Sequence, residues 1–93
     1  MDLRDASLDW DDADDDRGNT AHIAEHGLSP DEVESALFDD NTKFDVSDSS
    51  GRPIAFGYTI TGRLIAIVFD VLNFENPFIV RPITAYDVDE PME

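Results

Sequence analysis

The chain has 93 residues, with 22 acidic and 6 basic side chains and no cysteine, and its formal net charge at pH 7 is −16. A chain of this length forms one domain with a single modest core, so residues 1–93 are predicted to be a single domain. The absence of cysteine excludes disulfides and thiolate metal sites. A strongly negative field repels phosphate polymers and attracts cations or basic proteins, which disfavours nucleic acid as a partner.

The acidic excess is concentrated at the two ends of the chain. Residues 1–16 carry eight aspartates and one arginine, and residues 87–93 carry four acids without a basic residue. Acidic segments with few apolar residues resist folding, so 1–7 and 87–93 are predicted to be disordered tails. The acidity is equally consistent with a salty habitat that selects acidic surfaces, or with detached tails that leave a positive cleft in residues 17–86. Within the first acidic segment, Leu8 and Trp10 alternate with Asp9, a pattern that predicts a short strand.

The longest apolar stretch, Leu64 to Phe69, is much shorter than a membrane span. No cationic and apolar signal segment opens the sequence. We therefore expect a soluble, cytoplasmic protein that does not bind a membrane.

Two helices are predicted before residue 40. The first runs from Asn19 or Thr20 and ends at Gly27, because glycine readily takes the left-handed conformation that closes a helix. The second runs from about Pro30 to Phe38, with Ser29 as its N-cap and Glu32 completing a capping box. Its apolar residues recur at helical spacing, which predicts one face packed on the rest of the domain.

Strands are predicted in the second half of the chain. The expected ranges are Lys43–Val46, Pro53–Ile60, Arg63–Leu72 and Phe78–Ile83, and Thr61 and Gly62 form a tight turn between the second and the third. Pro82 cannot donate to a strand ladder, so it is expected at an edge or a bulge. The predicted fold is therefore α+β, with two N-terminal helices packed on one face of an antiparallel sheet of about four strands.

The apolar run Leu64 to Phe69 shows no polar alternation. A strand of this kind is covered on both faces. The helices cover one face, and a partner is a candidate for the other.

Short motifs spread over Leu8 to Ala85 resemble the BrnT family of bacterial toxins. The matching residues are Trp10, Asp11, Asn19, His26-Gly27-Leu28, Phe38-Asp39-Asp40, Arg52, Gly57, Gly62-Arg63-Leu64 and Arg81 to Ala85. The resemblance implies a RelE-like α+β fold, ribonuclease activity without metal or cofactor, and inhibition by a cognate DNA-binding antitoxin. It also implies a catalytic set of His26, Arg63 and Arg81.

Cleavage of RNA without metal needs a base, an acid and cations against the charge of the phosphorane. His26 is a candidate acid or base because imidazole titrates near neutral pH. Arg52 joins the other arginines as a candidate phosphate ligand, and Tyr58 and Tyr86 are candidates for stacking on bases. Each of these residues also has a simpler, structural explanation. The helix dipole favours a histidine at the C-terminal end of a helix, the arginines can pair with the abundant carboxylates, and strand tyrosines are often half-buried packing residues.

The sequence departs from the family where positive charge is expected. Glu25 replaces the lysine before the histidine, and Tyr86 replaces an arginine. The basic C-terminal helix of the family is replaced by acids at positions 87, 89, 90 and 93. Each change disfavours RNA, so weakened or lost cleavage is expected.

Two sequence patterns resemble metal-binding motifs, but neither has the other residues that a metal site needs. His22, Glu25 and His26 spell His-x-x-Glu-His, but the helix ends at once and a third ligand and a cleft are missing. The aspartates of residues 11–16 lack the glycine and the closing glutamate of an EF-hand. No metal or cofactor is therefore expected.

Two functions from different classes stay open. One is a BrnT-like ribonuclease toxin, and the other is a non-catalytic acidic module that binds a basic protein. The expected partner is a cognate antitoxin or another basic protein, and a homodimer also stays open.

Overall fold

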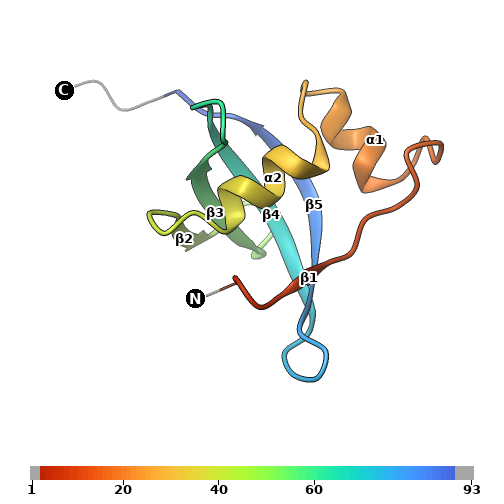
Figure 1. Cartoon of the computed structure of the whole chain (residues 1–93), viewed down its shortest axis with the longest axis vertical. Coiled ribbons are helices and arrows are strands. Elements are labelled where there is room, and N and C mark those ends of the chain that lie inside the picture. The colour runs from red at the N-terminus through yellow and green to blue at the C-terminus, as the bar shows by residue number, and fades with distance from the viewer. Residues whose placement is uncertain (1–2, 90–93) are drawn as a thin grey trace.

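The computed structural model describes residues 3–89, which form two short helices and a five-stranded sheet (Figure 1). The elements in chain order are β1 (Ser7–Leu8), α1 (Asn19–Ala24), α2 (Pro30–Leu37), β2 (Lys43–Val46), β3 (Pro53–Tyr58), β4 (Leu64–Asn73) and β5 (Ile79–Asp87). The α+β class and the order of one strand, two helices and four strands are confirmed.

The sheet has the strand order β1-β5-β4-β3-β2. Strands β2 to β5 pair antiparallel with their neighbours, while β1 pairs parallel with the start of β5. The prediction of about four antiparallel strands is therefore wrong in this respect, because β1 adds a fifth strand and makes the sheet mixed.

Helix α2 begins as its sequence predicts. The Ser29 side chain accepts from the backbone N–H of Glu32, and the Glu32 carboxylate accepts from the N–H of Ser29. The buried side chains of α2 are those of Val33, Ala36 and Leu37, and the helix contacts β3 and β4. Gly57 makes this contact close, because a Cβ there would overlap the Ala36 carbonyl.

Helix α1 lies beside β5 (Figure 1), whereas α2 contacts β3 and β4, and Ile23 of α1 is buried in the same core as Val33 of α2. The helix packing therefore differs from the prediction, because α1 contacts mainly β5 while α2 contacts mainly β3. The helix also ends at Ala24, and the chain continues through turns to Gly27, whose φ is +73°. The reason for its position is a polar network that joins its first residue, Asn19, to β5.

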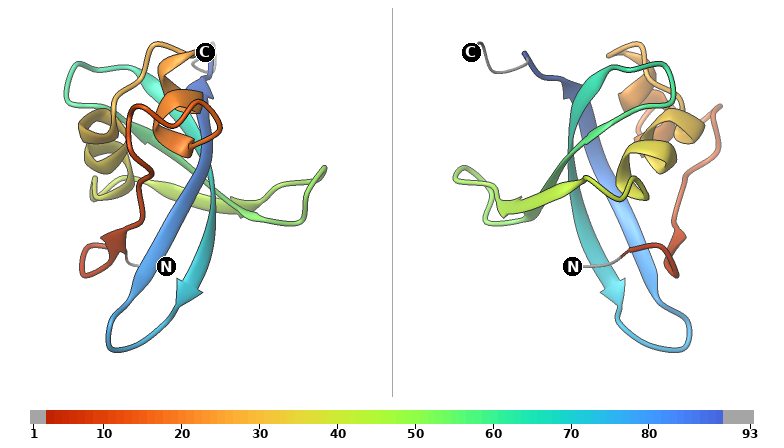
Figure 2. Two further views of the ribbon diagram at one scale, coloured as in Figure 1. Left: turned by 90° about the vertical axis from the view of Figure 1, so that its right-hand side faces the viewer. Right: turned by 60° about the vertical axis from the view of Figure 1, so that its left-hand side comes forward.

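The core lies between the sheet and α2, where Ile65, Ile67 and Phe69 of β4 are buried. The other side of β4 carries Ala66 and Val68, which form a second, smaller apolar cluster with Ile54. Both faces of this strand are thus apolar. Within residues 3–89, however, no helix covers the second face, as the two views of Figure 2 show.

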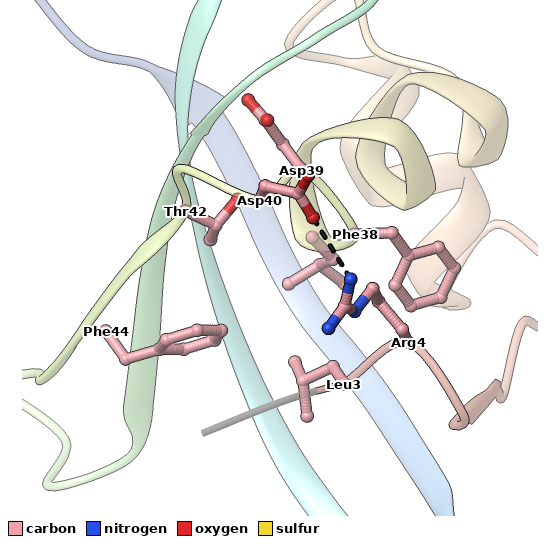
Figure 3. Close-up of a pocket in the computed structure, with 8 residues that line it drawn as sticks. Leu3, Arg4, Phe38, Asp39, Asp40, Thr42 and Phe44 are labelled. Carbon is pink, nitrogen blue, oxygen red and sulfur yellow. Dashed lines mark hydrogen bonds and ion pairs between the residues drawn. The ribbon is translucent and has the colours of Figure 1, made fainter.

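The N-terminal segment is part of the fold. Leu3 is buried in the core, and Arg4 forms an ion pair with Asp40 at 3.1 Å, beside a hollow in front of β2 (Figure 3). At the other end, Asp87 belongs to β5 and Val88 packs on the second apolar cluster. Leu3, Asp87 and Val88, which belong to the predicted tails at 1–7 and 87–93, therefore contribute to this fold. Residues 1, 2 and 90–93 lie outside the described residues.

Strand β5 is longer than predicted because a register shift absorbs its proline. Phe69 pairs with Pro82 while Val68 pairs with Thr84, so Ile83 is the extra residue, and β5 continues to Asp87. β1 pairs only with Ile79 and Val80. The prediction that Pro82 lies at an edge or a bulge is confirmed. Among residues 3–89, no helix is long and apolar enough to cross a membrane.

Candidate functional site

Arg81 lies on β5 and is held by two carboxylates of the N-terminal segment. Its Nη2 donates to Asp11 Oδ2 at 2.6 Å, and its Nη1 donates to Asp11 Oδ1 at 3.2 Å and Asp9 Oδ2 at 3.1 Å. A bidentate pair of this kind is a strong charge-assisted contact. The hydrogen bond with Asp11 raises the pKa of Arg81, which stays charged. This arginine is therefore neutralised locally by more than one carboxylate.

Asn19 connects the same cluster to helix α1. Its Oδ1 accepts from the backbone N–H of Asp11 at 2.8 Å, and its own N–H donates to Asp11 Oδ2 at 2.9 Å. Its Nδ2 donates to the carbonyls of Asp9 and Pro82 at 2.9 and 2.8 Å. Asn19 is buried, and these bonds hold α1 against β5. We call Asp9, Asp11, Asn19 and Arg81 the Arg81 cluster.

The Arg81 cluster predicts a specific dependence of stability on pH. The hydrogen bond from Arg81, and then that from the Asn19 N–H, hold the pKa of Asp11 below its ordinary value. A carboxyl group with a depressed folded-state pKa stabilises the fold above its unfolded pKa of about 4, and this contribution is lost as the pH falls below that value.

We therefore expect Asp11→Asn to be less stable than wild type at pH 7, and the difference to shrink at pH 3. Urea unfolding at the two pH values measures it. Asp12→Asn is the control, because it removes the same charge one residue away and outside the cluster. An equal effect of both substitutions at pH 7 would contradict the assignment.

Arg63 lies in a second carboxylate cluster at the end of β5. It donates from Nε and Nη2 to the two oxygens of Asp87 at 3.0 and 2.7 Å, and from Nη1 to Glu32 Oε2 at 3.3 Å. Nη1 and Nη2 also donate to the carbonyls of Gly27 and His26. The bond with Asp87 raises the pKa of Arg63, and the same bond lowers the pKa of Asp87. Arg63 thus ties β5 to the ends of both helices.

His26 is next to this second cluster. Its ring centroid is 6.4 Å from that of Tyr86 and 5.6 Å from that of His22. His22 Nδ1 lies 3.7 Å from a carboxylate oxygen of Glu25. No group of three or more metal-ligating His, Asp or Glu side chains is found among residues 3–89.

The remaining predicted binding residues lie elsewhere. Arg52 precedes β3 and donates from Nε to Asp70 Oδ1 at 3.0 Å. Tyr58 ends β3 and is 41% exposed beside a hollow on the sheet face opposite α2. Tyr86 is exposed on β5.

The proposed catalytic residues are not gathered in one place. Arg63 contacts Asp87, which is six residues from Arg81 along β5, or roughly 20 Å on an extended strand. His26 belongs to the Arg63 end. The structure therefore brings His26 and Arg63 together and leaves Arg81 apart, and it pairs each of the three predicted arginines with carboxylates. The alternative that the arginines pair with acids is confirmed.

A hollow of about 290 Å³ lies beside Arg81, between β5 and the start of α1. Arg17 and His22 also contribute to its lining. This lining is more cationic than that of the hollows beside Arg4 and Lys43. Arg81 faces Asp9 and Asp11 at the same time, which reduces its attraction for an anion.

Sequence reasoning missed Asp9 and Asp11 as partners of Arg81 and Asn19 as the residue that binds Asp11. Their separation from Arg81 along the chain is 72 residues for Asp9 and 70 for Asp11. The one signal was the place of Asp11 and Asn19 among the residues that resemble the toxin family. No protein-family profile matches the sequence, and no characterised protein is detectably similar to it.

Proposed function

We propose that this chain is a divergent BrnT-like toxin-antitoxin family protein that has lost catalysis and acts as an acidic module that binds a basic protein. The observation that carries the proposal is the pairing of Arg52, Arg63 and Arg81 with carboxylates. Attraction of RNA depends on cations that are free to replace its counterions. Arginines held by aspartates contribute little to that exchange.

The net charge supports the same conclusion. The chain carries −16, which slows association with polyanions and accelerates association with cationic proteins. The α+β class of the fold is the class that the resemblance implies, and it supports the family part of the proposal.

A metal-independent ribonuclease is the second candidate. It is favoured by the hollow that Arg17, His22 and Arg81 line. In that case His22, which lines this hollow, takes the place of His26 as the acid or base.

Incubation of the full chain with a mixed-sequence RNA in the presence of a chelator separates the two candidates. We expect no cleavage above that of the double variant His22→Ala, Arg81→Ala, because neither residue acts on RNA. Cleavage by wild type that disappears in the double variant would establish the ribonuclease and end the non-catalytic proposal.

A further inference from the structure

The sheet face opposite α2 carries a continuous apolar surface. The pairs Ile54–Val68, Phe56–Ala66 and Tyr58–Leu64 are direct cross-strand partners of β3 and β4. Directly opposed residues share a face of the sheet. Ile83 and Val88 extend this surface toward β5, since both pack on the same cluster. We call these residues together the open face.

The open face is only partly buried by its own side chains. Ala66 is fully buried and Val68 nearly so, while Phe56 and Leu64 are half-buried and Tyr58 is exposed. In the described range 3–89, no helix lies on this side of the sheet (Figure 2). A contiguous apolar surface of this kind on a small domain is typical of a binding site.

A hollow of about 340 Å³ is set into the open face. Its apolar lining comes from Phe56, Tyr58, Leu64 and Val88. This volume is near the lower end of the range for ligand sites. It suits one or two apolar side chains that project from a docked polypeptide.

The charges around the open face determine which kind of molecule binds there. Asp45 is the cross-strand partner of Ile54, and Asp89 and Lys43 both line the hollow. Arg52, next to β3, is neutralised by its ion pair with Asp70. A second copy of this chain brings another 16 negative charges, and nucleic acid brings a negative charge on each phosphate. Both are repelled, whereas a polypeptide that places lysine or arginine beside its apolar side chains is attracted.

We propose that the open face is the docking surface for an amphipathic helix of a protein partner, with apolar side chains along one side and lysine or arginine along its flanks. This inference rests on the proposed function and specifies where the basic partner binds. The apolar side chains enter the hollow beside Tyr58, and the flanking cations face Asp45 and Asp89. Helix-in-groove recognition of this type uses apolar anchors at helical spacing.

The test uses the full chain and a labelled synthetic helix of about 18 residues, or five turns, with leucine on one side and lysine on the other. A matched peptide keeps every lysine and replaces each leucine by serine. Fluorescence anisotropy at about 0.15 M salt, where exposed charges are screened beyond about 8 Å, measures both affinities. We expect the leucine peptide to bind at least about tenfold more tightly, which corresponds to about 1.4 kcal/mol.

Tyr58→Ser and Ile60→Ser are the paired variants. Ile60 is 89% exposed in the turn after β3 and outside the open face, so it controls for the loss of an exposed apolar side chain. We expect Tyr58→Ser to weaken binding of the leucine peptide about tenfold and Ile60→Ser to leave it within about twofold. Thermal melts establish that both variants are folded.

The results that would contradict the docking surface differ from those that would contradict the proposed function. Equal binding of the two peptides, or tight binding that Tyr58→Ser leaves unchanged, overturns the docking surface and leaves the basic-partner function standing. A homodimer that Tyr58→Ser dissociates, detected by light scattering, overturns the proposed occupant. Failure to bind either peptide, together with RNA cleavage, overturns the proposed function itself.

Discussion

Asn19→Ala lowers the free energy of unfolding by about 3 kcal/mol, because it leaves several part-buried backbone groups without partners. The carbonyls of Asp9 and Pro82 lose their donor, and the N–H of Asp11 loses its acceptor. Each unsatisfied group of this kind costs about 1–3 kcal/mol. In a domain of this size the melting temperature falls by about 4–8 °C for each kcal/mol, so thermal unfolding measures a shift of about 12–24 °C.

Asn73→Ala is the matched control for this substitution. The Asn73 amide also donates to two carbonyls, those of Glu75 and Pro77, at 2.9 and 2.7 Å. These bonds are exposed, so water replaces them when the amide is removed. We expect a shift of less than about 4 °C, in line with a surface substitution of at most about 0.5 kcal/mol. Equal shifts for the two variants would show that Asn19 does not fix α1 to β5.

Arg81→Met lowers the free energy of unfolding by about 2 kcal/mol, because Asp9 and Asp11 then face each other without a cation between them. Hydrogen bonds to charged groups contribute about 1.5–3 kcal/mol each when shielded. The 29% exposure of the Arg81 side chain reduces this figure through solvent screening. Urea unfolding at pH 7 and low salt measures the change.

Arg52→Met provides the comparison for Arg81→Met. It removes the same charge, but Arg52 makes a single bond to Asp70 and is 45% exposed. Exposed pairs of this kind contribute about 0.2–1 kcal/mol. Removal of a catalytic arginine that is not needed for folding often leaves the stability of a protein unchanged or raises it. An Arg81→Met variant as stable as wild type would therefore favour the ribonuclease over the binding module.

The parts of the fold that depend on neighbouring residues were predictable from sequence. Ser29, Pro30 and Glu32 lie within four positions of one another, and they form the capping box as predicted. The turn with Gly62 is also local, and its φ of +88° is the conformation that glycine was expected to supply.

The position of α1 and the pairing of β1 with β5 could not be predicted in this way. The bond from Asn19 to the Pro82 carbonyl spans 63 residues, and nothing in the local pattern of 19–27 indicates which strand α1 contacts. The pairing of Ser7 and Leu8 with Ile79 and Val80 is equally distant. Acidic composition near these residues predicted a tail, but burial of Leu3 and two ion-paired aspartates keep the segment on the domain.

For the candidate site, composition predicted the kind of contact and not the partners. An excess of acids over bases favours paired arginines, and the three arginines in question are paired. Which aspartates they bind depends on the tertiary fold. The apolar run Leu64 to Phe69 predicted a strand covered on both faces. The structure covers one face with the core and leaves the other as the apolar open face, with no helix over it among residues 3–89.

Chemical-shift mapping of the full chain distinguishes the open face from the hollow beside Arg81 as the binding surface. The backbone amide spectrum is recorded during titration with the leucine and lysine helix, and separately with a short RNA. We predict that the peptide shifts the amides of Phe56, Tyr58 and Leu64, and that RNA leaves the spectrum unchanged. RNA that shifts the amides of Arg17, His22 and Arg81, with no response of the open face to the peptide, would contradict the acidic binding module.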